Sequence, residues 1–228
     1  VEYAKRTITV IRKYFPRQTL FIIPINEISF FAWIGADRGV WAPFTKGSAN
    51  GYRFKKQLVK ATLQSIDAIR KIDTNVVFIL NDPFMRRVNN SPENKVIQNT
   101  VDEFNNMIRW QAWDMLSGKT EPELGGSPEY LQIMGVNYYF HCQETVRASK
   151  SDKNIIYRAM SWNSPQRVSF SSMLKEIYDR YHTDIVITET GSFQNRRKSW
   201  WNRILAEVDE AVQEGLPIQG VCAYPTVD

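Results

Sequence analysis

Two glutamates, Glu27 and Glu189, each follow a short apolar run, residues 20–25 and 185–188. A carboxylate just past the last apolar residue of a buried strand is held at the rim of a sheet, where parallel α/β folds place their chemistry. Two such carboxylates converging on one crevice can act as acid/base and nucleophile in the cleavage of a glycosidic bond. For either glutamate alone, the competing interpretation is a structural carboxylate that pairs with an arginine.

Five apolar segments separated by amphipathic patterns predict the sheet that would position these glutamates. The strands are expected at residues 20–25, 76–80, 133–139, 185–189 and 220–224. The helices are expected around residues 4–15, 58–69, 97–115, 173–181 and 200–213. The stretch 81–94 is expected to be turn-rich, and 142–167 to be a loop. This alternation predicts an α/β fold with a parallel sheet and right-handed crossovers.

The length and composition are those of one globular domain spanning residues 1–228, since the chain is 43% hydrophobic. It contains no apolar stretch near the roughly 18 residues of a membrane span. The N-terminus, residues 1–6, lacks the apolar region of a signal peptide. We therefore expect a cytoplasmic protein without a membrane partner.

Cysteine and histidine are too sparse for a disulfide framework or a zinc site. The two cysteines, Cys142 and Cys222, are expected to be reduced thiols. His141 lies beside Cys142, but a zinc site needs three or four ligands, and the only other histidine is His182. We expect neither a metal nor another cofactor.

The net charge of +5 is compatible with an anionic binding partner. Basic residues cluster at 196–198, beside two tryptophans, and at 86–87. No nucleic-acid-binding motif accompanies them, so we interpret them as a solvated surface and expect no nucleic-acid partner. Aromatic rings beside cations also suit sugars, and the patch alone does not discriminate between these partners.

The segments 24–27, 135–139 and 187–191 resemble the signature strand ends of family 1 glycoside hydrolases, the β-glucosidase-like branch of the clan A barrels, and occur in that family's order. The segment 220–228 is similar to the family's final strand, especially in divergent bacterial relatives. The resemblance implies a (β/α)8 TIM-barrel fold. It also implies an incomplete barrel, because the chain holds only about five of the eight strand/helix units, from the third helix to the eighth strand.

The resemblance implies roles for the two glutamates and their neighbours. Glu27 would be the general acid/base, and Glu189 the nucleophile of a retaining, double-displacement mechanism. Asn26 would bond the sugar 2-hydroxyl, and Tyr139 would hydrogen-bond Glu189. Asn137, on the same side of that strand, would support the site.

Two aromatic side chains complete the expected site. Tyr224 stands where the family usually carries a tryptophan sugar platform. Trp33, in the expected loop after Glu27, either lines a sugar site or covers the core, as does Trp41. Of the adjacent Tyr138 and Tyr139, one is open to interpretation as packing, because neighbouring residues on a strand face opposite ways.

The chain also departs from the family pattern. Ile28 replaces the proline of the usual Asn-Glu-Pro, and Thr190 replaces the asparagine of Thr-Glu-Asn-Gly. Neither change removes a reacting atom. The family's first-strand glutamine and third-strand histidine, which hold sugar hydroxyls, have no counterpart in this chain.

Three hypotheses remain open from the sequence. The first is a retaining hydrolase of β-glycosides, similar to β-glucosidases or β-galactosidases, with a carbohydrate substrate that the sequence does not identify further. The second is a catalytically silent partial barrel that binds carbohydrate or a protein partner. In both, an open barrel edge would favour self-association. The third is a basic nucleic-acid-binding domain, which the lack of a motif disfavours.

Overall fold

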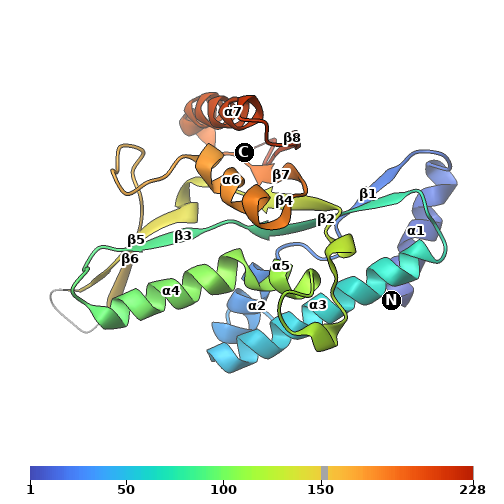
Figure 1. Ribbon diagram of the computed structural model, residues 1–228, viewed down its shortest axis with the longest axis horizontal. Helices are drawn as coiled ribbons and strands as arrows, with labels where there is room; N and C mark the ends of the chain where they lie inside the picture. Colours follow the sequence, from blue (N-terminus) through green and yellow to red (C-terminus); the bar gives the residue numbers. More distant parts are fainter. Residues whose placement is uncertain (150–153, 228) are drawn as a thin grey trace. The chain divides into compact units, whose positions relative to one another are not determined.

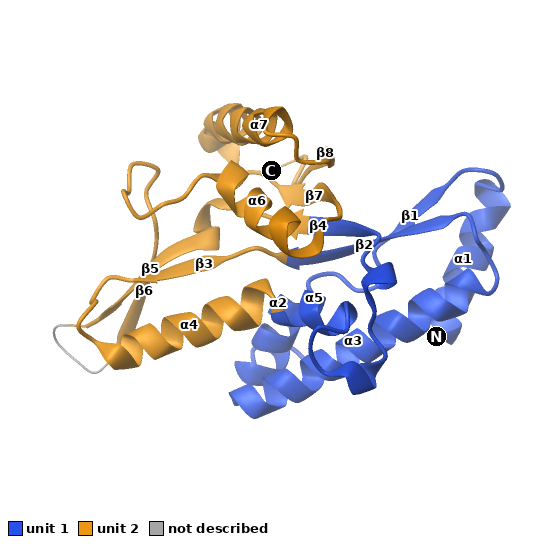
Figure 2. Cartoon of the chain, viewed as in Figure 1, with its two compact units in different colours: residues 1–82, 111–135 blue, residues 83–110, 136–228 orange. Residues whose placement is uncertain are grey.

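The computed structural model describes residues 1–149 and 154–227 of the chain (Figure 1). These residues divide into two compact units (Figure 2). Unit 1 comprises Val1–Asp82 and Gln111–Gly135, and unit 2 comprises Pro83–Trp110 and Val136–Asp228. The interpretation of residues 1–228 as a single domain stays a prediction.

Unit 1 contains the first helices and strands. They are α1 (Glu2–Tyr14), β1 (Leu20–Ile22), α2 (Ile28–Ala32), the π-helix η1 (Trp33–Asp37), α3 (Ser48–Arg70), α5 (Gln111–Leu116) and the short 3-10 helices η2 (Pro122–Leu124) and η3 (Pro128–Tyr130). Two strands, β2 (Val76–Pro83) and β4 (Ile133–Asn137), begin in unit 1 and end in unit 2.

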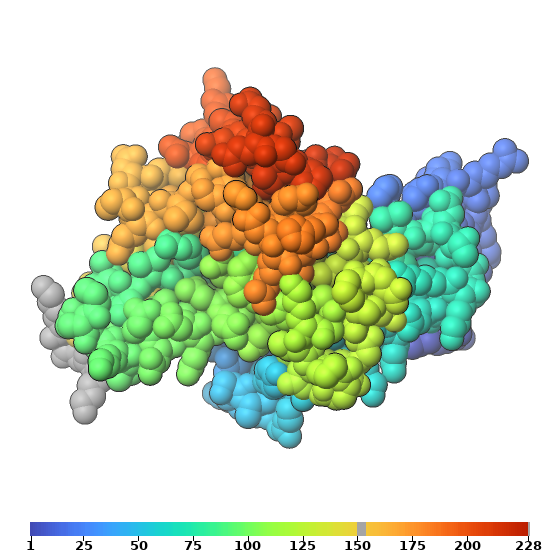
Figure 3. All heavy atoms as spheres, viewed as in Figure 1, coloured from blue at the N-terminus to red at the C-terminus, as the bar shows by residue number. Residues whose placement is uncertain are grey.

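Unit 2 contains the remaining elements. They are β3 (Arg86–Asn89), α4 (Lys95–Arg109), η4 (Phe140–Cys142), β5 (Gln143–Ala148), β6 (Ile155–Ala159), α6 (Phe170–Tyr181), β7 (Asp184–Thr190), η5 (Gln194–Arg196), α7 (Arg197–Gln213) and β8 (Ile218–Ala223). In the space-filling view, α4 and α7 each present one side at the surface of this unit (Figure 3). Both helices bury an apolar stripe, as amphipathic helices do.

The five strands expected from the sequence form one sheet in the order β1-β2-β4-β7-β8. The outer pairs are parallel, with Leu20 opposite Val76 and Ile185 opposite Ile218. A helix-containing connection joins each strand of this sheet to the next. The predicted fold class is therefore confirmed: an α/β fold of the TIM-barrel type, with about five of its eight units.

The first strand is shorter than the apolar run predicts. It ends at Ile22, whereas the apolar pattern continues to Ile25. Pro24 has no backbone N–H to donate to a neighbouring strand, so the run cannot continue as a paired strand. Glu27 consequently lies in the turn that leads into α2, and Glu189 lies within β7.

One long helix expected over residues 97–115 is two helices, α4 and α5, separated at Trp110. The two have different packing partners. In α4, Ile97 and Val101 pack with Val146 of β5. In α5, the buried Trp113 donates its indole N–H to the Leu80 carbonyl at 3.0 Å. Periodicity alone could not show this break, because the apolar spacing continues through it.

A second sheet, ordered β3-β5-β6, corrects two predictions. The expected turn-rich stretch 81–94 contains β3, and the expected loop 142–167 contains β5 and β6, although its residues 150–153 lie outside the described residues. Charged and polar side chains interrupt the apolar residues of β3 and β5, and β6 holds only a short apolar run. Arg87 and Glu144 are opposite each other and form an ion pair at 2.9 Å, a pairing that stabilises neighbouring strands.

Two other expectations concern membranes and metals. Among the helices of residues 1–149 and 154–227, none combines the length and apolar character that crossing a bilayer requires. Within the same residues, no group of three or more His, Cys, Asp or Glu side chains is arranged to hold a metal ion. The described cysteines are free thiols, with Cys142 buried and Cys222 exposed.

Close contact between β2 and β4 depends on Gly135. A Cβ atom at Gly135 would lie 2.4 Å from Asn81 Cβ and 2.9 Å from Asn81 Cα. We expect Gly135→Ala to lower the free energy of unfolding by about 1–3 kcal/mol, measured by urea denaturation, because the strands must move apart. Gly220→Ala in β8 is the control, since a Cβ there meets nothing within 4 Å. Equal losses in both variants would contradict this explanation.

Candidate active site

Glu27 occupies an unusual backbone conformation at the start of α2. Its φ and ψ are 51° and 60°, in the left-handed region that few residues other than glycine adopt. Its carbonyl accepts a hydrogen bond from Phe31 N at 2.8 Å, but its side chain does not cap the helix. A residue persists in this region only where the surrounding structure holds it, and such positions concentrate at functional sites.

Polar groups near the carboxyl end of β2 hold the turn around Glu27. Asn26 Oδ1 accepts a hydrogen bond from Asn81 Nδ2 at 2.5 Å. The backbone N–H of Ser29 donates to both carboxylate oxygens of Asp82, at 2.9 and 3.2 Å. Asn81 and Asp82 are both buried, so these bonds are shielded from water. The turn that carries Asn26 and Glu27 is thus fastened to β2 on both sides of the glutamate.

Asp82 belongs to a buried group of charges. The Lys55 side chain, from α3, is 1% exposed and donates to Gln111 Oε1 at 3.0 Å. Burial lowers the pKa of Lys55 to about 8, against the opposing attraction of Asp82 and Asp37. Burial raises the pKa of Asp82 to about 7, although its bonds from Ser29 and the charge of Lys55 act the other way. The charge of Glu27 adds to the upward shift.

Trp33 lies in the helical segment η1 instead of the expected loop. It is partly buried, its ring lies 5.8 Å from that of Phe30, and the Arg38 guanidinium lies 6.0 Å from its ring centroid. Trp41 is 52% exposed, and its ring centroid lies 5.6 Å from that of Phe30. The two tryptophans therefore form an aromatic group after Glu27, and a role in sugar binding stays a prediction for Trp33.

In unit 2, the end of β4 and the residues after it surround Glu189. Tyr139 Oη donates a hydrogen bond to Glu189 Oε2 at 2.8 Å, and Tyr138 N donates to the Glu189 carbonyl at 2.9 Å. The fully buried Asn137 accepts a hydrogen bond from Thr188 Oγ1 at 2.6 Å. One glutamate oxygen is thus oriented by a phenol, while backbone pairing fixes the strand that carries it.

Tyr138 is the packing residue of the tyrosine pair. It is 1% exposed, and its ring stacks on Phe170 at 4.1 Å between centroids with an interplanar angle of 10°. Burial raises the pKa of Tyr138 to about 12. Its hydroxyl group receives hydrogen bonds from Gln143 and Arg167 at 2.8 and 3.1 Å. Tyr139, on the opposite side of the chain, is the one that reaches the carboxylate.

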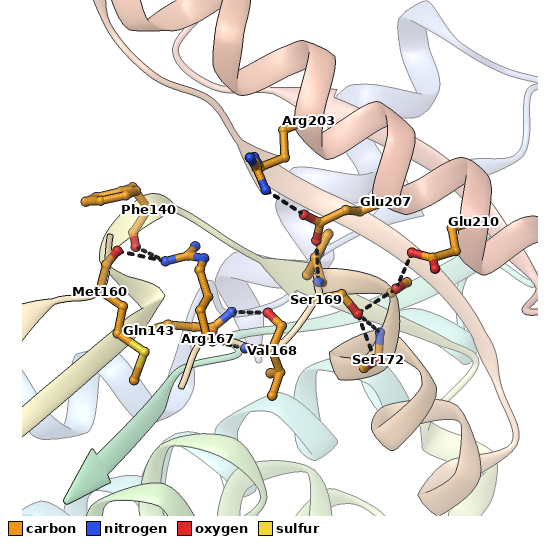
Figure 4. A network of polar contacts seen from close by, with 12 residues as sticks. Phe140, Gln143, Met160, Arg167, Val168, Ser169, Ser172, Arg203, Glu207 and Glu210 are labelled. Carbon is orange, nitrogen blue, oxygen red and sulfur yellow. Dashed lines mark hydrogen bonds and ion pairs between the residues drawn. The ribbon is translucent and has the colours of Figure 1, made fainter. Parts of the chain in front are cut away.

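A polar network connects β5, the segment before α6 and the start of α6 (Figure 4). Gln143 exchanges two hydrogen bonds with the backbone of Val168, at 2.9 and 3.1 Å. Arg167 donates to the Met160 carbonyl at 3.1 Å, and Ser169 caps α6 by accepting from Ser172 N at 3.1 Å. Because each partner is a backbone group or a helix cap, the network holds α6 and the preceding loop against β5.

Tyr224 follows β8 and is 58% exposed. Its backbone N–H donates to the Thr190 carbonyl at 3.0 Å, directly after Glu189 on β7. Gly191 allows this approach, since a Cβ there would lie 2.2 Å from the Tyr224 carbonyl oxygen. The role of Tyr224 as a sugar platform stays a prediction.

The structure thus gathers the expected site residues in two groups. Asn26 and Glu27 are together in unit 1, and Asn137, Tyr139 and Glu189 are together in unit 2. The predicted mechanism requires a short distance between the carboxyl groups of Glu27 and Glu189, and that distance stays a prediction.

Sequence reasoning missed Asn81, Asp82 and Lys55. The strand-end rule applied to the two glutamates also identifies Asn81 and Asp82, which follow the apolar run 76–80. For Lys55 the sequence contained only a weak indication. It lies one turn before Leu58, on the apolar stripe of its helix. A lysine there usually extends its charged end to solvent, so burial was not the expected outcome.

Comparison with known proteins shows the fold. No family model matches the sequence, and no curated protein matches it. Among solved structures, the chain is similar to a β-glycosidase from Pyrococcus horikoshii, with 16% identity and a TM-score of 0.71 over 98% of this chain and 54% of that one. It is also similar to a family 1 β-glucosidase from Thermotoga maritima, with 16% identity and a TM-score of 0.67 over 89% and 53%.

A β-glucosidase from Thermotoga maritima in complex with noeuromycin also matches, with a TM-score of 0.64 and 16% identity, over 90% of this chain and 53% of that one. The chain therefore has a fold like that of family 1 glycosidases. It spans about half the length of the solved structures that it matches.

Proposed function

We propose that this chain carries the two catalytic glutamates of a retaining β-glycosidase, with Glu27 as acid/base and Glu189 as nucleophile. The observation that carries the proposal is the hydrogen bond from Tyr139 Oη to Glu189 Oε2, at 2.8 Å, in a fold like that of family 1 glycosidases. A phenol donating to one carboxylate oxygen orients the group and leaves the other oxygen to attack.

In the first step, Glu189 attacks the anomeric carbon while Glu27 donates its proton to the leaving glycosidic oxygen. The glycosidic bond breaks and a glycosyl ester forms on Glu189. In the second step, Glu27 as a carboxylate removes a proton from water, which attacks the anomeric carbon and releases Glu189. This exchange requires the two carboxyl groups to approach within about 5–5.5 Å.

The other predicted residues would hold the sugar. Asn26 would bond the 2-hydroxyl, an interaction that strengthens in the transition state. Tyr224 and Trp33 would contribute aromatic faces, and Asn137 would keep Thr188 and the strand before Glu189 in place. The substrate class is a β-glycoside such as a β-glucoside or β-galactoside. A cytoplasmic location and the divergent bacterial branch of the family stay predictions.

The test is covalent trapping. A 2-deoxy-2-fluoro glycoside forms a long-lived ester on the nucleophile of a retaining enzyme, and mass spectrometry identifies the modified peptide. We expect an adduct on the peptide that contains Glu189 with a gluco- or galacto-configured reagent. Complete absence of an adduct with a panel of sugar configurations, in a sample whose folding is verified by circular dichroism, would reject the enzymatic proposal.

Replacing Tyr139 by phenylalanine should slow formation of the adduct. A hydrogen bond to a charged group contributes about 1.5–3 kcal/mol, so we expect a rate roughly 10- to 100-fold lower. Tyr138→Phe is the control, since its hydroxyl group bonds Gln143 and Arg167 instead of Glu189. That control should lower thermal stability and leave the trapping rate within about 3-fold of wild type. A similar rate loss in both variants would show that Tyr139 acts only through folding.

The second candidate is a silent partial barrel that binds carbohydrate or a protein partner. The strands β1 and β8 end the strand order, and Phe21 of β1 is largely exposed, which suits self-association at an open edge. Sugar binding by calorimetry without trapping would favour this candidate, and the mass in solution would report self-association.

A further inference from the structure

The turn after β4 fixes the main chain of Tyr139. This residue leaves the strand in an extended conformation, and the 3-10 turn η4 (Phe140–Cys142) follows it. The Tyr139 N–H donates to Cys142 Sγ at 3.1 Å, and the Cys142 N–H donates to the Tyr139 carbonyl at 2.9 Å. Cys142 is 1% exposed, so this anchor is buried. The main chain of Tyr139 is therefore held in place, and the direction of its side chain is the freedom that remains.

His141, in the middle of the same turn, places its ring beside the ring of Tyr139. The two ring centroids are 5.7 Å apart with an interplanar angle of 3°, which is an offset parallel stack. The His141 side chain itself is exposed. Partial burial lowers the pKa of His141, against the attraction of Glu144, so the imidazole is neutral at pH 7.5. A neutral surface ring thus stacks on the phenol that donates to Glu189.

The direction of the Tyr139 side chain decides whether its hydroxyl group reaches Glu189. The hydroxyl oxygen lies on the axis about which the phenol ring turns, so only rotation about the Cα–Cβ bond carries it away from the carboxylate. That torsion has three staggered minima, and one of them places Oη 2.8 Å from Glu189 Oε2. Rotation to another minimum would separate the phenol from the imidazole and lose the stack. The contact with His141 therefore favours the minimum from which Tyr139 donates.

We propose that His141 is a positioning residue for the proposed reaction, and that its ring holds the Tyr139 side chain in the orientation from which the hydroxyl group donates to Glu189. The effect of this orientation on catalysis rests on the proposed function. The orientation itself does not, so the two can be tested separately. Because His141 acts through a ring contact, another flat ring can replace it, whereas a polar contact with a substrate would need the imidazole nitrogens.

The first measurement needs no substrate. The carbon that bears the Tyr139 hydroxyl group is followed by ¹³C NMR of tyrosine-labelled protein, and Tyr139→Phe identifies its resonance. Glu189→Ala gives the position of this resonance without the hydrogen bond. In His141→Asn we expect the resonance to move toward that position, because the phenol is no longer held in one orientation. In His141→Phe, which keeps a flat ring, the resonance should stay at the wild-type position.

The second measurement is the rate of covalent trapping by the 2-deoxy-2-fluoro glycoside. From the usual strength of an aromatic pair, we expect His141→Asn to react about 3- to 10-fold more slowly, and His141→Phe to stay within about 2-fold of wild type. His182→Asn is the matched control. The His182 ring also lies 5.7 Å from a tyrosine ring, that of Tyr178, and its left-handed backbone at the end of α6 accepts asparagine. This variant should trap at the wild-type rate.

A double variant tests whether His141 acts through the Tyr139 hydroxyl group. Once that group is absent, Tyr139→Phe/His141→Asn should react within about 2-fold of Tyr139→Phe alone. A further loss in the double variant, equal losses in His141→Phe and His141→Asn, or an unmoved Tyr139 resonance in His141→Asn would each overturn the proposal. If the resonance moves but the wild type forms no adduct on Glu189, the proposed function fails while the orienting role of His141 stands.

Discussion

The covalent adduct should disappear altogether when Glu189 is replaced by glutamine, because the amide cannot displace the leaving group at the anomeric carbon. Glu27→Gln should still form the adduct from a reagent with a good leaving group. It should lower turnover of an unactivated glycoside about 10²- to 10⁴-fold, the usual contribution of general acid/base catalysis. The measurements are intact-protein mass spectrometry and steady-state rates on the two classes of substrate.

The control for this pair is Glu103→Gln, an exposed glutamate on α4. It should leave adduct formation and turnover unchanged. An adduct that persists in Glu189→Gln, or that maps to another peptide, would remove Glu189 as the nucleophile. If Glu27→Gln affected activated and unactivated substrates equally, Glu27 would not be the acid.

The second large effect concerns how the stability of the fold depends on pH near Lys55. Burial is the largest cause of the lowered pKa of Lys55, so we expect Lys55→Met to change the pH dependence of the free energy of unfolding, measured by urea denaturation. Lys60→Met on the same helix is the control, since Lys60 is exposed and should keep the pH dependence of the wild type.

The pKa shifts of Lys55 and Asp82 predict how the stability of the fold varies with pH. The pKa of Lys55 is lowered by burial, so its contribution is present above the unfolded value of 10.5 and is lost as the pH falls through about 8. The pKa of Asp82 is raised by burial, so its contribution is present below the unfolded value of 3.8 and is lost as the pH rises through about 7. Lys55→Met should therefore abolish the rise in stability between pH 8 and 10.5.

The sequence alone determined the main sheet and its helices. Apolar runs such as 76–80 and the stripe that includes Leu58 and Ile66 are local patterns, so they identify strands and helices without knowledge of their neighbours. The positions of Glu27 and Glu189 past such runs follow from the same patterns. The family resemblance added their expected roles, because spacing cannot distinguish a catalytic carboxylate from a structural one.

Only the tertiary structure decided which polar groups meet. The bond between Tyr139 and Glu189 joins residues 50 positions apart in the sequence, and the bond between the Ser29 N–H and Asp82 joins residues 53 positions apart. The second sheet was not predicted for the same reason. Charged residues such as Arg87 and Glu144 are expected at the solvent-exposed surface, and only the tertiary structure shows that they pair across two strands.

Lys55 is the clearest example of a residue whose surroundings the sequence did not predict. A lysine on an apolar stripe is expected to extend its ammonium group to solvent. Only the tertiary structure shows that Lys55 is buried, as Asp82 is. The two glutamates were therefore detectable from sequence because their positions are local. The polar side chains around them were not, because only long-range packing brings together residues such as Asp82 and Ser29, or Tyr139 and Glu189, that are distant in the sequence.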